Sequence, residues 1–134
     1  MKAGRPLDPG LFSLLRTARS FRFAAAGLRY LARTQPNFRV HLAAAVAALG
    51  TGVALGISAV ETAALLLTIG LVLVAEAVNT AIEAAVDLAS PEFHPVARIA
   101  KDAAAAAVLL TAIVAVLVGL IVLGPRLLGR LLGT

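Results

Sequence analysis

The sequence predicts an all-α membrane protein with one surface-lying helix followed by three transmembrane helices. Hydrophobic residues make up 60% of the 134-residue chain, and the mean hydropathy is +0.96. A water-soluble domain of this size has too little interior to bury so much apolar surface. Three long apolar segments carry most of it, and a basic segment precedes them. The length predicts a single domain, which we place at residues 11–134.

Residues 11–34 are expected to form an amphipathic helix that lies on the membrane surface. Its arginines fall within an arc of roughly 140° at about 100° per residue, and its apolar face is ragged, which favours a surface helix over a spanning one. A basic helix that only sets topology would show the same pattern. Residues 1–10 lack the apolar core of a signal peptide and are predicted to be a disordered tail. The arginines are Arg16, Arg19, Arg22, Arg29 and Arg33.

Three apolar spans are predicted at residues 42–58, 60–82 and 103–123. Pro36 separates them from the first helix, because proline removes a donor and disfavours helix at Gln35. The third span has 21 residues and would be about 31 Å long, which matches a hydrocarbon core of about 30 Å. Gly52 and Gly56 form a GxxxG pair, which we interpret as small packing residues rather than a specific dimer motif.

The distribution of charge predicts the orientation and excludes some functions. Eight of the twelve Lys and Arg residues precede residue 40, and the second loop contains Arg98 and Lys101. The positive-inside rule therefore places the N-terminus and the second loop in the cytoplasm, although Arg126 and Arg130 oppose a C-terminus outside. The chain has no cysteine, which excludes disulfide and thiol chemistry. Its few aromatic residues argue against a nucleic-acid partner.

A polar stripe closes the second span. Glu76, Asn79, Glu83 and Asp87 are spaced 3, 4 and 4 residues apart, which places them on one helical face. If the span enters the membrane near Thr62, Glu76 lies roughly 8 Å below the cytoplasmic boundary and Glu83 lies at it. Buried charge costs a few kcal/mol per residue even on the mildest scales, so the stripe requires a function.

Three interpretations of the stripe compete. It could be a polar seam between helices, a cation or proton path, or a site for chemistry at the membrane surface. The second loop favours the last, because it concentrates charge in residues 87–102, DLASPEFHPVARIAKD. Lys101 could hold a phosphate as a point charge, and Asp102 could orient Lys101 or assist a metal. The nucleotide motifs GxxxxGK[ST] and GxGxxG are both absent from the sequence.

A longer pattern resembles a known family. The segment EAVNTAIEAAVDLASPEFHPVARIAKD, residues 76–102, follows the order E-x-x-N-[ST]-A-I-E-x-x-V-D, then E-[FY]-H and A-K-D. This is similar to the signature of the prokaryotic diacylglycerol kinase family, which includes undecaprenol kinases. The resemblance covers about residues 19–124, and NFRVH and EFHP lean toward the undecaprenol kinase branch. The alternative is a small oligomeric membrane protein that uses the stripe only for ion or proton transfer or for assembly.

The resemblance implies a homotrimeric, multi-pass enzyme of the bacterial inner or cell membrane, with active sites shared between subunits at the cytoplasmic face. ATP would phosphorylate a lipid alcohol, either undecaprenol or diacylglycerol, to give undecaprenyl phosphate or phosphatidic acid, with Mg²⁺ as cofactor. By motif position, the implied roles are catalytic base for Glu76, contact with the lipid hydroxyl for Asn79, magnesium binding for Glu83, and nucleotide binding for Glu83, Asp87, Glu92, His94, Lys101 and Asp102.

Gln35 departs from the family pattern. Well-known members have a glutamate at this position, where it helps the equivalent of Glu83 to bind metal. The amide oxygen of Gln35 can still ligate magnesium but adds no charge. We therefore expect Glu83 and Gln35 as the protein's metal ligands.

Overall fold

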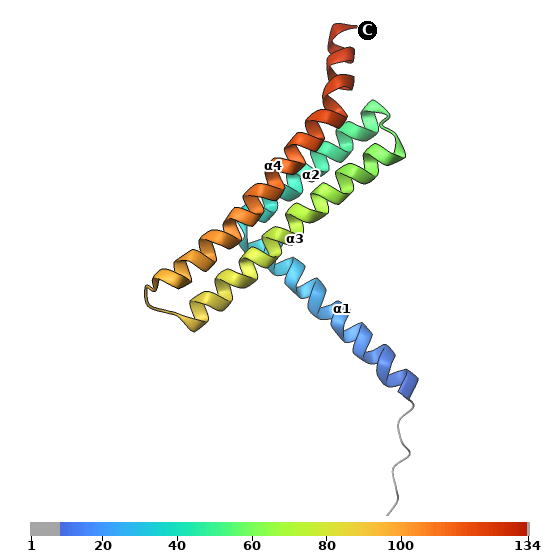
Figure 1. Cartoon of the computed structure of the whole chain (residues 1–134). Coiled ribbons are helices and arrows are strands. Elements are labelled where there is room, and N and C mark those ends of the chain that lie inside the picture. Colours follow the sequence, from blue (N-terminus) through green and yellow to red (C-terminus); the bar gives the residue numbers. More distant parts are fainter. Residues whose placement is uncertain (1–8, 134) are drawn as a thin grey trace, which may run out of the picture. The chain divides into compact units, whose positions relative to one another are not determined.

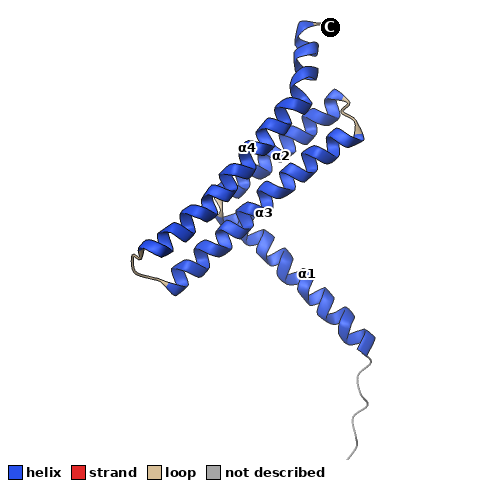
Figure 2. Ribbon diagram, viewed as in Figure 1, coloured by secondary structure: helices blue, strands red, loops and turns tan. Residues whose placement is uncertain are grey.

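A computed structural model describes residues 9–133 as four α-helices, and no strand occurs in that range (Figure 2). The helices are α1 (Pro9–Thr34), α2 (Pro36–Leu55), α3 (Ala59–Ala89) and α4 (Pro95–Leu132). The predicted all-α class is confirmed. The predicted N-terminal tail lies outside the described residues, except that Pro9 and Gly10 already belong to α1.

The chain divides into two units, and α1 belongs to the first. It is a single long helix of 26 residues whose described side chains are mostly exposed. The hydroxyl of Thr34 donates to the carbonyl oxygen of Tyr30 at 2.8 Å in the last turn. Gln35 follows in an extended conformation with φ −100° and ψ 107°, as expected for a residue before proline. The break between the two helices thus lies where Pro36 predicts it.

The second unit is a bundle of α2, α3 and α4, which run alternately up and down (Figure 1). Helix α3 packs along α4 over most of its length and along α2 less extensively. Gly56 ends α2 in the left-handed region, at φ 66°, where glycine has no side chain to clash. Ser58 then begins α3 with a capping box, because its Oγ accepts from the Glu61 N–H while a Glu61 carboxylate oxygen accepts from the Ser58 N–H.

All three helices of the bundle begin before the predicted apolar spans, and α3 and α4 also end after them, whereas α2 ends at Leu55, three residues before the predicted end of its span. Helix α2 begins at Pro36 rather than at residue 42, because proline fits the first helical position, where its missing N–H is not needed. Helix α3 has 31 residues and contains the whole polar stripe, and α4 has 38 residues with Pro125 inside it. The polar residues that flank the apolar segments therefore belong to the same continuous helices.

The surface of the bundle is that of a membrane protein. Helices α2, α3 and α4 are each long and apolar enough to cross a membrane. Large apolar side chains such as Leu67, Leu110 and Ile121 are more than half exposed, whereas few large side chains of the described residues are buried, Leu65 most completely. Exposed apolar surface on this scale needs hydrocarbon rather than water around it.

Polar contacts fasten one end of the bundle. The guanidinium group of Arg126 on α4 forms two parallel hydrogen bonds with the carboxylate of Glu61 on α3, and its Nη2 to Oε2 distance is 2.9 Å. Arg130 donates to the carbonyl oxygen of Ala54, near the end of α2, at 2.8 Å. The C-terminal part of α4 therefore passes the α2–α3 connection and projects beyond it, at the end of the bundle opposite the α3–α4 connection (Figure 1).

Candidate functional site

The polar stripe of α3 passes from a buried to an exposed environment. Glu76 and Asn79 are 3% and 8% exposed, Glu83 is half-buried, and Asp87 is exposed. Because α3 stays helical from Glu76 to Asp87, the stripe rises by about 16 Å along the axis. A carboxylate held inside the bundle is thereby placed on the same helix as carboxylates that water-soluble molecules can reach.

Asn79 is the best-defined polar group of the buried part. Its Nδ2 donates to Oε1 of Glu83 at 3.1 Å, which orients both side chains. Its Oδ1 is buried and accepts no hydrogen bond from any described residue. A buried acceptor without a donor costs about 1–3 kcal/mol. An incoming hydroxyl group would remove that cost.

Thr80 is a neighbour that the sequence analysis did not single out. It is buried, and its hydroxyl donates to the carbonyl oxygen of Glu76 at 3.0 Å. A threonine hydroxyl often returns to the preceding turn in this way, so the type of residue alone does not mark it as part of a site. It supports the backbone that carries Glu76.

A second group of polar residues surrounds a pocket of about 340 Å³ at the α3–α4 connection. Lys101 on α4 reaches back to α3, and its Nζ lies 2.9 Å from Oδ1 of Asp87. Lys101 is thus held by Asp87, whereas Asp102 lies 3.6 Å from Nε of Arg98. The pocket brings together five of the predicted site residues, which are Asp87, Glu92, His94, Lys101 and Asp102.

His94 has a structural role that leaves one ring nitrogen available. Its Nδ1 accepts from the backbone N–H of Val96 at 3.2 Å and so caps the first turn of α4. Nε2 is then the nitrogen that can face a ligand in the pocket. Glu92 lies in the short connection, where its carbonyl oxygen accepts from the Ser90 hydroxyl at 3.1 Å. Both residues are exposed at the mouth of the pocket.

Gln35 lies at the start of the bundle unit, as the residue that precedes α2. It does not cap α2 through its side chain, and its carbonyl oxygen accepts from the Arg39 N–H at 3.3 Å. In the part of the chain that the structure describes, no group of three or more His, Asp or Glu side chains is placed to hold a metal ion. The assignment of Glu83 and Gln35 as metal ligands therefore stays a prediction.

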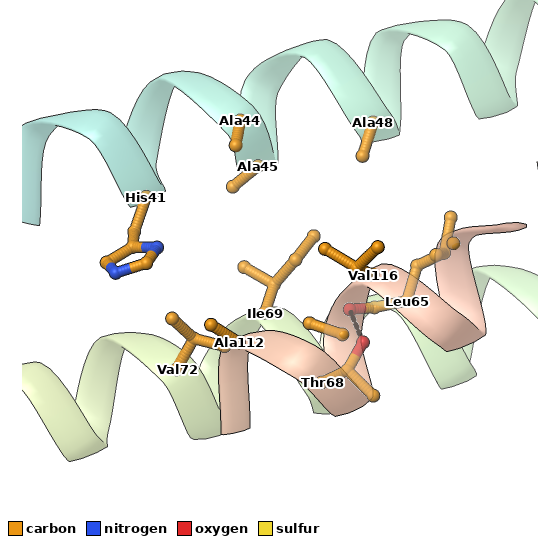
Figure 3. A pocket seen from close by; sticks show the side chains of 12 residues that line it. His41, Ala44, Ala45, Ala48, Leu65, Thr68, Ile69, Val72, Ala112 and Val116 are labelled. Carbon is orange, nitrogen blue, oxygen red and sulfur yellow. Dashed lines mark hydrogen bonds between the residues drawn. The ribbon is translucent and has the colours of Figure 1, made fainter. Parts of the chain in front are cut away.

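A mostly apolar cavity of about 280 Å³ lies between α2, α3 and α4, with the imidazole of His41 on α2 among its lining side chains (Figure 3). Small side chains such as Ala45 and Ala48 line it from α2, opposite Ile69 of α3 and Val116 of α4. The hydroxyl of Thr68 is satisfied within its own helix, at 3.0 Å from the Leu65 carbonyl oxygen. The cavity also reaches Val72, one helical turn from Glu76. It therefore offers apolar space next to the buried carboxylate.

Comparison with known proteins points to one family. The model of the family described as "Prokaryotic diacylglycerol kinase" matches residues 10–123. A diacylglycerol kinase of Synechocystis sp. is 48% identical over 110 residues, which are 81% of this chain and 63% of that relative. An undecaprenol kinase of Bacillus subtilis is 42% identical over 114 residues, 85% of this chain and 93% of the relative. A diacylglycerol kinase of Escherichia coli is 36% identical over 97 residues.

Proposed function

Because this chain belongs to the prokaryotic diacylglycerol kinase family, we propose that it is an integral membrane lipid kinase that transfers the γ-phosphoryl group of ATP to a lipid hydroxyl. The observation that carries the proposal is the gradient of burial along α3, from Glu76 to Asp87. A lipid hydroxyl stays near the membrane, whereas ATP arrives from water. A site for both needs polar groups at two depths on one rigid element, and α3 supplies them.

Glu76 is proposed as the general base. As the lipid oxygen forms its bond to the γ-phosphorus, the hydroxyl proton passes to Glu76 and the bond between that phosphorus and the leaving oxygen of ADP breaks. Before the transfer, the unpaired Oδ1 of Asn79 would accept a hydrogen bond from the arriving hydroxyl and orient it, and the same proton then turns to Glu76; Glu83 holds the Asn79 amide in place by accepting from Nδ2. The apolar cavity beside Val72 suits an acceptor that carries a hydrocarbon chain.

The pocket at the α3–α4 connection is proposed to bind the nucleotide. Lys101 would neutralise the phosphates, and Asp87 keeps its ammonium group in position at 2.9 Å. Glu92 and His94 line the same pocket and are proposed to contact the nucleotide, His94 through Nε2, with Asp102 assisting. Phosphoryl transfer depends chiefly on positioning and on stabilising charge, and these side chains can do both.

Mg²⁺ fits the available donors when ATP brings it. Magnesium sites in kinases commonly use one or two carboxylates together with substrate phosphates and water, so a complete protein cage is not required. Glu83 is half-buried and lies on α3 between Asn79 and Asp87. One of its carboxylate oxygens accepts from Asn79, and the other is left for a metal ion. Glu83, with the amide oxygen of Gln35, would hold the ion, which would neutralise phosphate charge.

The proposed assembly is a homotrimer in the bacterial cell membrane, with shared active sites at the cytoplasmic face and α1 as an amphipathic helix on that surface. The arginines of α1 support this orientation, and so does the α2–α3 connection, which contains no Lys or Arg. The nearest charged residue after that connection is Glu61, in the first turn of α3. Basic side chains on a surface helix also favour contact with anionic lipids.

The test uses ³²P-labelled ATP and the purified full-length chain, with undecaprenol and diacylglycerol offered in parallel. The expected result is a labelled phospholipid with at least one acceptor, formed about 10²- to 10⁴-fold more slowly by Glu76→Gln. The relatives are named for one acceptor each, so the arms also identify the substrate. If neither lipid is labelled when the protein is folded and magnesium is present, the proposal is overturned. That result would favour a membrane protein that uses the polar stripe for ion or proton transfer or for assembly.

A further inference from the structure

Arg98 is the one charged residue of the nucleotide pocket to which no role has yet been given. It lies in the second turn of α4, three residues before Lys101, so both side chains leave the same helical face. We propose that Arg98 is a further phosphate-binding residue, whose guanidinium group contacts the polyphosphate tail of ATP in the pocket at the α3–α4 connection. This inference rests on the proposed kinase function.

The availability of Arg98 is the first argument. Its only described ion pair joins Nε to Oδ2 of Asp102 at 3.6 Å, between side chains that are 71% and 72% exposed. Such a long, exposed pair holds an arginine weakly. Lys101, in contrast, is 37% exposed and lies 2.9 Å from Asp87. Arg98 can therefore leave its partner for a phosphate at lower cost than Lys101 can.

The backbone at the start of α4 gives the second argument, because it has little left to offer an anion. Pro95 has no N–H, the N–H of Val96 donates to His94 Nδ1, and that of Arg98 donates to the His94 carbonyl oxygen at 3.1 Å. Of the first four residues of the helix, only Ala97 can keep a free donor. Phosphate recognition at this helix start therefore depends mainly on side chains, in contrast to the usual helix N-terminus.

The balance of charge gives the third argument. Three carboxylates line the pocket against two basic side chains, which leaves a net charge of −1 with His94 neutral. Without Arg98 the same pocket would carry −2, which opposes the entry of a triphosphate. A planar guanidinium group also matches two phosphate oxygens at once, whereas a lysine ammonium acts as a point charge. Arg98 thus adds positive charge to the pocket and a defined geometry for binding the phosphate oxygens.

The experiment measures nucleotide affinity in two independent ways on purified full-length protein. Equilibrium binding of labelled ATP without lipid is compared with the KM for MgATP at saturating lipid, for wild type, Arg98→Ala and Arg98→Lys. We expect Arg98→Ala to weaken both by about tenfold, the loss of one charge-assisted hydrogen bond, and Arg98→Lys to lie between. The KM for lipid should not change. AMP, tested as a competitor, should lose less affinity than ADP.

Two controls separate this role from others. Arg130→Ala removes an arginine at the far end of α4, about 48 Å away along the helix axis, and should leave the KM for MgATP unchanged. If Arg98 acts only by holding Asp102, its effect will vanish in an Asp102→Asn background; as a phosphate ligand it persists there. Unchanged ATP binding in Arg98→Ala would overturn the inference. A wild type that binds ATP but labels no lipid would instead overturn the kinase proposal.

Discussion

At the scale of single residues, the environment of Glu76 and Asn79 decides what each can do. Both are buried on one face of α3, one turn apart, yet they differ in their contacts. Asn79 is fixed by Glu83 through one amide atom and leaves the other unpaired. A buried polar group that is oriented but has no hydrogen-bond partner is unusual in a protein interior, and a substrate hydroxyl could supply the missing donor.

The first prediction tests Glu76 as the base. Glu76→Gln preserves size and hydrogen bonding but cannot take a proton, so kcat should fall by about 10²- to 10⁴-fold. Labelled ATP should bind as it does to wild type, since the nucleotide pocket is not touched. Glu61→Gln, which changes a carboxylate at the opposite end of the bundle, is the matched control. Near wild-type turnover in Glu76→Gln would show that Glu76 is not the base and that the polar stripe only packs the helices together.

The second prediction concerns the metal ligands. Glu83→Gln should raise the magnesium concentration needed for half-maximal activity, because one carboxylate charge is lost. If the Gln35 amide oxygen also ligates magnesium, Gln35→Glu should lower that concentration and Gln35→Ala should raise it. Magnesium titrations at saturating lipid compare the three variants. Should both Gln35 variants titrate like wild type, Gln35 would leave the site, and its role would be confined to the junction before α2.

At the scale of helices, the two ends of the bundle are built differently. The α3–α4 end is a short exposed connection rich in charge, as expected for a region that must admit a ligand. The other end is closed by polar contacts among all three helices, made by Glu61, Arg126 and Arg130. Arg126 and Arg130 lie beyond residue 123, where the family match ends. The two arginines that stabilise the far end thus lie outside the matched region, whereas Glu61, the partner of Arg126, lies inside it.

The third prediction addresses this closure. Glu61→Gln and Arg126→Gln should each lower the thermal unfolding temperature in detergent, because each leaves a charged partner without its counterpart. The double variant should lose less than the sum of the two, which a double-mutant cycle detects. Lipid phosphorylation at a temperature where all variants are folded should stay near wild type. Strictly additive losses would mean that the two side chains do not stabilise one another.

At the scale of the whole molecule, the bundle holds two groups of charged residues at its opposite ends. Asp87 and Lys101 meet at one end, and Glu61 and Arg126 meet at the other. If the polar stripe uses ATP as proposed, the α3–α4 connection must face the cytoplasm. The same orientation follows from the basic residues that precede residue 40.

The fourth prediction tests this orientation by labelling cysteines with a membrane-impermeant reagent in intact cells. The chain has no native cysteine, so each introduced thiol gives a clean signal. Ala59→Cys, which leaves the Ser58 cap intact, should be labelled from outside. Ser90→Cys should be labelled only after the membrane is permeabilised. The reverse pattern would place the nucleotide pocket on the face without ATP.

The sequence by itself determined the helical class, the three apolar spans, the break at Pro36 and the common helical face of the polar stripe. These follow from composition and from the 3.6-residue period, which are local properties of the chain. Where a helix ends was less predictable, because apolar segments mark the hydrocarbon core whereas backbone hydrogen bonding continues past it. Helix α3 therefore runs on to Ala89 and α4 to Leu132.

Only the tertiary structure decided which polar groups meet. Asp87 and Lys101 are fourteen residues apart, and Glu61 and Arg126 are sixty-five apart. Neither pair has a sequence signature, because each depends on how antiparallel helices are aligned by the packing of their apolar faces. Sequence reasoning linked Lys101 with Asp102, its neighbour in the chain, whereas packing paired Lys101 with Asp87 and left Asp102 to Arg98. Helical rotation explains the difference, since consecutive residues point about 100° apart.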